Sequence, residues 1–77
     1  MDTKLSIGEL VRKKRIEMSW TQEMLSSESG IYNRSLQKIE AGERTPSLIT
    51  IFKIASAFGI TPDKLINPLW KEWKKDN

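Results

Sequence analysis

The sequence predicts an all-α fold of five short helices, and three observations support that expectation. Apolar residues recur at helical spacing, in segments that open on capping residues and close near glycines. No segment shows the alternating apolar and polar pattern of a β-strand. The chain has 77 residues and no internal repeat, so it is expected to form one small domain with a single core.

The middle of the chain carries the most informative pattern, two short helices joined by a tight turn. Thr21 can cap the first of them, which is predicted over residues 21–27. Gly30 can supply the positive φ angle of the turn, and the next helix is predicted from residue 32 or 33 to residue 41. This arrangement is typical of a helix-turn-helix, whose second helix reads DNA.

The second helix of this pair has two chemically different faces. Apolar residues are expected on its inward side, namely Ile31, Leu36 and Ile39, and polar ones on its outward side, namely Asn33, Arg34, Gln37 and Lys38. Arg34 can donate two hydrogen bonds to guanine, and Lys38 can donate to guanine or to a phosphate. Asn33 or Gln37 can pair with adenine. These four polar residues are therefore the candidates for reading DNA bases.

Two further helices are predicted from their caps. One, over residues 6–18, opens on a capping box formed by Ser6 and Glu9. The other begins after Ser47 and ends at Gly59. It is expected to bury a broad apolar face made of Leu48, Ile51, Phe52, Ile54, Ala55 and Phe58.

The C-terminal third carries more apolar side chains than one small core needs. A short fifth helix is expected from Thr61-Pro62-Asp63, completing a domain of residues 1–67, followed by a separate short amphipathic helical tail of residues 68–77. Trp70 and Trp73 lie one helical turn apart in that tail. We expect a homodimer interface made of Ile60, Leu65, Leu69, Trp70 and Trp73. The alternative is that both tryptophans fold back over the core.

The residue inventory excludes several classes of function. The chain has no cysteine and no histidine, which excludes disulfides, thiolate chemistry, imidazole catalysis and most zinc or haem sites. No pair of carboxylates has the spacing of an acid–base couple, and no glycine-rich loop is suited to phosphate binding. We therefore expect no enzyme activity, no catalytic residues, no metal and no cofactor.

The charge distribution favours a polyanionic partner only mildly. The net charge is +3, from 13 basic and 10 acidic residues, and the predicted helix-turn-helix is no more basic than its flanks. The run Arg12-Lys13-Lys14 either approaches DNA or forms a solvated helix face. No apolar run approaches the roughly 18 residues of a membrane span, and no signal peptide is recognisable, so a cytoplasmic protein without a membrane partner is expected.

Residues from about 5 to 66 resemble the Cro and lambdoid phage repressor superfamily, often called XRE. The resemblance rests on motifs in a fixed order: Arg15, Thr21-Gln22-Glu23, Leu25, Gly30-Ile31, Ile39-Glu40-Ala41-Gly42, Pro46-Ser47-Leu48 and Ala55-Ser56-Ala57-Phe58-Gly59-Ile60. It implies a compact five-helix, repressor-like DNA-binding domain. Short stand-alone members include phage repressors, restriction–modification controller proteins and antitoxins, and the chain is most similar to the controller and small-repressor group.

The resemblance also implies roles for further residues. Gln22 matches a glutamine that touches the phosphate backbone and braces the recognition helix. Arg15 and Glu40 match a structural ion pair between the first and third helices. The remaining candidates for phosphate contact and positioning are Thr21, Tyr32, Ser35 and Arg44, and for Arg44 a solvated loop arginine is an equal alternative.

Two positions depart from the family pattern. Ser26 stands where alanine is usual, and it is small enough to leave the fold intact. Tyr32 stands where a small capping residue is usual. Either Asn33 caps the helix instead, or the Tyr32 ring lies along the DNA backbone with its hydroxyl on a phosphate. The alternative is a half-buried Tyr32 ring packed on the preceding helix.

The function that the resemblance implies is sequence-specific regulation of transcription. Such a regulator binds a two-fold symmetric operator in double-stranded DNA as a homodimer, here in its own control region. The alternative is an antitoxin, which binds its operator and also holds a protein toxin. A specific DNA footprint without any partner favours the regulator, and co-purification of a second protein favours the antitoxin.

Overall fold

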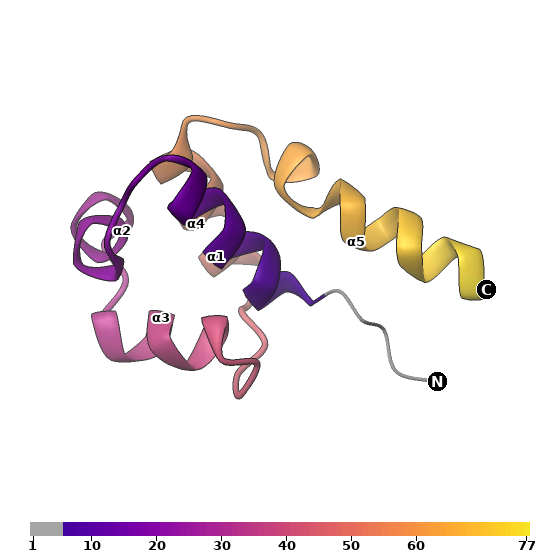
Figure 1. The fold of residues 1–77 in the computed structure, drawn as a ribbon, viewed down its shortest axis with the longest axis horizontal. Coiled ribbons are helices and arrows are strands. Elements are labelled where there is room, and N and C mark those ends of the chain that lie inside the picture. The colour runs from indigo at the N-terminus through magenta and orange to yellow at the C-terminus, as the bar shows by residue number, and fades with distance from the viewer. Residues whose placement is uncertain (1–5) are drawn as a thin grey trace.

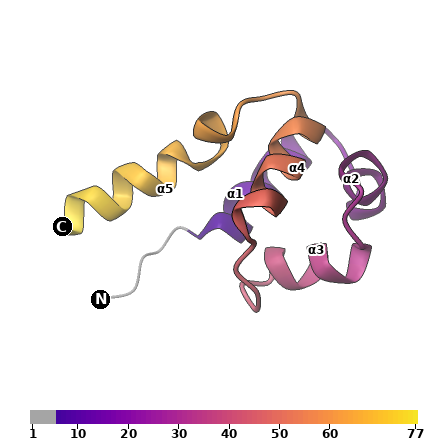
Figure 2. The same ribbon diagram turned by 180° about the vertical axis from the view of Figure 1, so that it is seen from behind.

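The computed structural model describes residues 6–77, which form five helices (Figures 1 and 2). They are α1 (Ile7–Glu17), α2 (Gln22–Ser29), α3 (Asn33–Glu40), α4 (Leu48–Phe58) and α5 (Pro62–Asp76). Residues 6–77 contain no β-strand, and none of their helices is long and apolar enough to cross a membrane. The predicted all-α fold of five helices is confirmed.

Side-chain caps determine where three of the helices begin. The hydroxyl oxygens of Ser6, Thr21 and Ser47 each accept a hydrogen bond from the amide three residues ahead, at 3.1 to 3.2 Å. These are the caps that the sequence predicted. Tyr32 occupies the N-cap of α3 without a capping side-chain bond, and Asn33 is already the first residue of the helix. Of the alternatives that the sequence left open, a cap by Asn33 is therefore excluded.

Every helix contributes to one core. Val11 of α1, Leu25 of α2, Leu36 of α3 and Ile54 of α4 are fully buried, and Leu65 closes the cluster from α5. Burying side chains of this size contributes about 1.5–3 kcal/mol each. The aromatic rings of Trp20 and Phe58 add a tilted contact, with centroids 5.6 Å apart.

The buried face of α4 is narrower than predicted. Leu48 and Phe52, expected in the core, are 63% and 43% exposed. The side of α4 that faces the core consists of Ile51, Ile54, Ala55 and Phe58. At about 100° of rotation per residue, Leu48 and Phe52 lie roughly 70° and 110° around the helix axis from the centre of that side.

α5 is longer than predicted, because the helix continues through Pro68. The expected short fifth helix and separate tail are one element, so the proposed boundary between residues 67 and 68 falls inside a helix. Pro68 has no amide to donate to the carbonyl of Lys64, and both residues lie in an exposed part of the helix. The second half of α5 projects away from the other helices (Figures 1 and 2).

Candidate nucleic-acid interface

The turn between α2 and α3 is held by a glycine and two serines. Gly30 ends α2 with a φ angle of 74°, which glycine adopts without steric cost. The Ser26 hydroxyl donates to the carbonyl oxygen of Ile31, and the Ser29 hydroxyl accepts from the amide of Ile31 at 3.3 Å. Both backbone groups of Ile31 are therefore tied to α2. Ser26, which replaces the usual alanine, thus helps to set the direction in which α3 leaves the turn.

α3 buries one side and exposes the other, largely as predicted. Leu36 and Ile39 are buried, whereas Arg34, Gln37 and Lys38 are exposed. Long donor side chains on a rigid, exposed helix are suited to reading base edges in the major groove of DNA. The structure therefore brings three of the four predicted base-reading residues together on one face.

Asn33 differs from those three residues. Its side chain is half-buried, and its Oδ1 atom is inaccessible to solvent and has no hydrogen-bond partner. The prediction that Asn33 presents its amide outward as Arg34 does is therefore wrong for its Oδ1 atom, although the residue still borders the exposed side of α3. A buried unpaired acceptor costs free energy, so the Asn33 amide gains by finding a donor.

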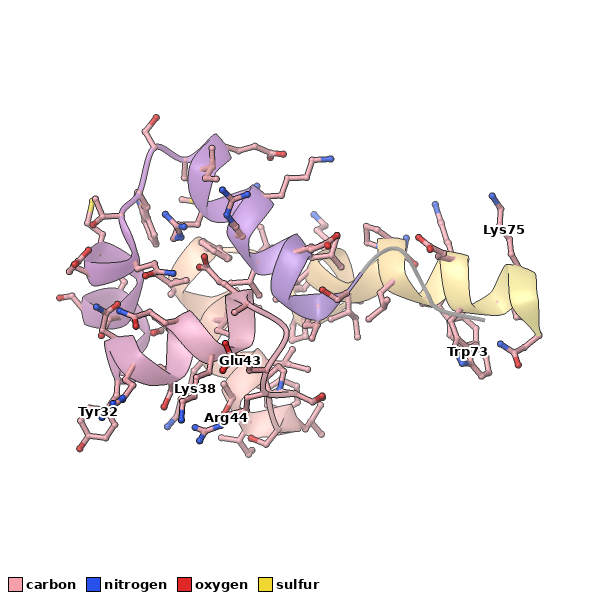
Figure 3. All side chains as sticks on the ribbon, turned by 60° about the horizontal axis from the view of Figure 1, so that its bottom comes forward. Tyr32, Lys38, Glu43, Arg44, Trp73 and Lys75 are labelled. Carbon is pink, nitrogen blue, oxygen red and sulfur yellow. The ribbon has the colours of Figure 1, made fainter. Side chains whose placement is uncertain are left out.

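A shallow hollow of about 410 Å³ lies along the exposed side of α3, lined by Tyr32, Asn33, Arg34, Ser35, Lys38 and Arg44. Tyr32 is 85% exposed, which rules out the expected alternative that its ring packs on α2. Arg44 donates to the Ser35 hydroxyl at 3.3 Å, so it is held against α3. Figure 3 shows Tyr32, Lys38 and Arg44 extending from the same side of the molecule. With three basic side chains and no acidic one, this lining is suited to an anion such as phosphate.

A buried polar cluster ties α3 to α1 and α2. The Nε and Nη2 atoms of Arg15 donate to the carboxylate of Glu40 at 2.8 and 2.9 Å, which is the ion pair expected from the sequence. Arg15 Nη1 donates to the carbonyl of Trp20 at 2.8 Å, and Gln22 Nε2 donates to Glu40 at 3.2 Å. The hydrogen bond with Glu40 raises the pKa of Arg15, although burial opposes this shift. Gln22, at the start of α2, therefore contacts the last residue of α3 through a carboxylate that is 4% exposed.

The sequence pattern did not reveal the part that Gly8 plays. A Cβ atom at this position would lie 1.9 Å from the carbonyl oxygen of Ile39. α1 and α3 thus contact one another backbone to backbone at the C-terminal end of α3. A glycine inside a predicted helix is the signal that could have indicated this close approach.

A second set of exposed apolar side chains is divided between α4 and α5. On α4 it comprises Leu48, Ile49 and Phe52, none of which the sequence assigned to a surface. On α5 it comprises Trp70 and Trp73, whose rings stack with centroids 5.5 Å apart. We refer to these five side chains as the α4–α5 surface. Because the tryptophans stay about half exposed, the alternative that they fold back over the core is not observed.

A hollow of about 390 Å³ adjoins Trp70 and Trp73 and is lined by Ile7, Thr45, Pro46, Ile51, Ile66, Leu69, Trp70 and Trp73. Of the residues expected at a dimer interface, Leu69 and both tryptophans line this hollow. Leu65 is instead 4% exposed within the core, and Ile60 packs half-buried against the core. Leu65 is therefore not available to a partner, because α5 turns this residue inward onto the core.

Comparisons with known proteins agree with this architecture. The chain is 32% identical over 68 residues to HTH-type transcriptional regulator y4dJ of Sinorhizobium fredii, an alignment that covers 88% of each protein. It is 35% identical over 65 residues to control protein C.BamHI of Bacillus amyloliquefaciens, covering 83% of this chain and 80% of the relative.

A solved structure and a family profile extend the comparison to the fold. The restriction–modification controller protein C.AhdI from Aeromonas hydrophila matches with a TM-score of 0.74 at 34% identity, covering 77% of this chain and 89% of that one. The profile of the helix-turn-helix family HTH_3 matches residues 11–65, which include α2, the turn and α3. The resemblance inferred from the sequence is thereby confirmed, and the chain belongs to the HTH_3 helix-turn-helix family.

Proposed function

We propose that the chain is a sequence-specific regulator of transcription that inserts α3 into the major groove of double-stranded DNA. The observation that carries this proposal is the exposed set of Arg34, Gln37 and Lys38 on a helix whose other side is fully packed. A helix held in this way presents its donors in a fixed geometry, which base readout requires.

Two groups of residues then have different roles in binding DNA. Arg34, Gln37 and Lys38 read base edges, and Asn33 joins them only if its amide turns outward. Phosphate contacts fix the register of the domain on the duplex without reading its sequence. We assign these to Thr21, Gln22, Tyr32, Ser35 and Arg44. The hollow along α3 supports the last three, because it collects them beside Lys38.

We further propose that two copies bind DNA together through the α4–α5 surface. A single recognition helix specifies few base pairs, and two-fold pairing sets two such helices about 34 Å apart, one turn of DNA. The five exposed side chains of this surface include two tryptophans, and aromatic residues are typical of the buried centre of an interface. This proposed interface keeps Trp70 and Trp73 from the set expected from the sequence and adds Leu48, Ile49 and Phe52 of α4.

The controller relatives support a regulator that acts on its own control region. C.BamHI is described as a control protein and C.AhdI as a restriction–modification controller, and the chain covers most of each. A footprinting experiment on the DNA upstream of its own gene tests this proposal. We expect the purified chain to protect two half-sites about 34 Å apart on one face of the duplex. Protection that requires a second protein, or no protection of any duplex, would contradict it.

A further inference from the structure

A third hollow lies between α1 and α5, at a site that DNA binding does not use. Its volume is about 370 Å³, and it is lined by Leu10, Lys13, Lys14, Glu17, Ile60, Lys64, Leu65 and Pro68. We refer to it as the α1–α5 groove. It is separate from both the hollow along α3 and the apolar hollow beside the tryptophans.

The lining of the α1–α5 groove combines positive charge with apolar surface. Lys13, Lys14 and Lys64 contribute three ammonium groups against the single carboxylate of Glu17. Lys13 and Lys64 are exposed and stand on opposite sides, one on α1 and one on α5. The apolar part of the lining consists of the half-buried Ile60 and the exposed Pro68, with the buried side chains of Leu10 and Leu65 at its base.

The α1–α5 groove is continued by a second hollow along α1. A neighbouring hollow of about 480 Å³ shares Leu10, Lys13 and Glu17 with the groove and adds Glu9, Arg12 and Ile16. Ile16 is half exposed and adds apolar surface to this hollow. The run Arg12-Lys13-Lys14 therefore borders apolar surface.

The position of the groove separates it from DNA. In Figures 1 and 2, α3 lies at the bottom of the molecule, whereas the first turn of α5, which carries Lys64, lies near the top. The α1–α5 groove also shares no lining residue with the hollow along α3.

We propose that the α1–α5 groove binds an acidic segment of a second protein, one that carries apolar side chains between its carboxylates. Carboxylates complement the lysines at the rim, and charge complementarity of this kind speeds encounter and selects partners. Apolar side chains of the segment cover Ile60 and Pro68, which a fully hydrated anion or a phosphate backbone leaves uncovered. The groove therefore favours an acidic polypeptide over a second stretch of nucleic acid.

Binding of a synthetic peptide to the full chain tests this inference. The probe is a fluorescent peptide of about 15 residues with leucine at helical spacing and glutamate elsewhere, compared with a copy in which glutamine replaces every glutamate. The test variant is Lys13→Glu with Lys64→Glu. The control variant, Lys53→Glu with Lys74→Glu, makes the same charge change at two exposed lysines outside the groove.

We expect the acidic peptide to bind the wild-type chain and the control about equally, and to bind the groove variant about tenfold more weakly. The glutamine peptide should bind weakly to the wild-type chain and to both variants. An equal loss of affinity for the acidic peptide in both variants, or no loss of affinity in either, overturns the proposal. Operator binding is measured alongside, and a loss confined to the groove variant would mean that the groove contacts DNA instead. Thermal unfolding of each variant shows that the fold is intact.

Discussion

Gly8 of α1 lies directly against the backbone carbonyl of Ile39 in α3, so closely that a Cβ atom at position 8 would be 1.9 Å from the carbonyl oxygen. No side chain fits between these two helices at this point. The neighbouring residue of α3, Glu40, accepts hydrogen bonds from Arg15 and Gln22. The C-terminal end of the recognition helix is therefore held by a backbone contact on one residue and by a charged cluster on the next.

Gly8→Ala should destabilise the fold by about 1–3 kcal/mol, because α1 and α3 must move apart to admit the methyl group. Helix propensity alone favours alanine by about 1 kcal/mol, so the two effects have opposite signs. Chemical denaturation gives the difference directly, and Glu9→Ala at the adjacent exposed position is the control. A Gly8→Ala chain more stable than the wild type would contradict the close contact.

Glu40→Ala should lower the free energy of unfolding by about 3 kcal/mol, because it leaves the guanidinium of Arg15 partly buried without its carboxylate partner. For a domain of this size, that loss corresponds to a fall in melting temperature of the order of 10–20 °C. The base preference of the folded fraction should stay unchanged. Glu43→Ala, in the exposed loop after α3, should leave the melting curve where it is. An altered base preference with an unchanged melting curve would place Glu40 in the DNA site.

Ser19→Gly should stabilise the chain by about 0.5–1 kcal/mol. Ser19 has a φ angle of 58°, a left-handed conformation that strains a residue with a Cβ atom. Thermal unfolding should show a rise in melting temperature. The matched control is Ser27→Gly, which falls inside α2 and should lower stability because glycine weakens a helix interior. A lower melting temperature for both variants would show that the backbone at Ser19 is not strained.

The helices and the face of α3 could be predicted because they depend on local signals. Thr21 caps α2, Gly30 makes the turn, and the apolar spacing across Leu36 and Ile39 gives the buried side of α3. These features follow from neighbouring residues, so the linear pattern contains them.

The remaining features depend on how helices pack, which the linear pattern does not contain. Leu48 and Phe52 fit an apolar helix face, but α4 buries only the part of that face that meets its neighbours. Leu65 was expected on the surface, whereas the packing of α5 against α1 and α4 turns it inward. Pro68 normally ends a helix, yet here it lies in an exposed part of α5 and the helix continues through it.

Trp70→Ala combined with Trp73→Ala should shift the chain from dimer toward monomer and weaken operator binding cooperatively. The two stacked indoles are the α5 side chains of the α4–α5 surface, and their loss removes the aromatic residues of the proposed interface on α5. Analytical ultracentrifugation at micromolar concentration measures the change. Ile16→Ala removes a half-exposed apolar side chain from α1 and should leave the dimer intact. Normal dimerisation without either tryptophan would exclude this interface.

Selection of binding sites from random double-stranded DNA tests base readout by α3 most directly. The wild-type chain should enrich a two-fold symmetric site. Arg34→Ala should lose about 1–3 kcal/mol of binding free energy and relax the preference at one base position in each half-site. Gln22→Ala should weaken binding to all sequences more evenly, because the proposed role of Gln22 is a phosphate contact and its observed partner is Glu40. An Arg34→Ala chain that selects the wild-type site with wild-type affinity would contradict recognition through this face of α3.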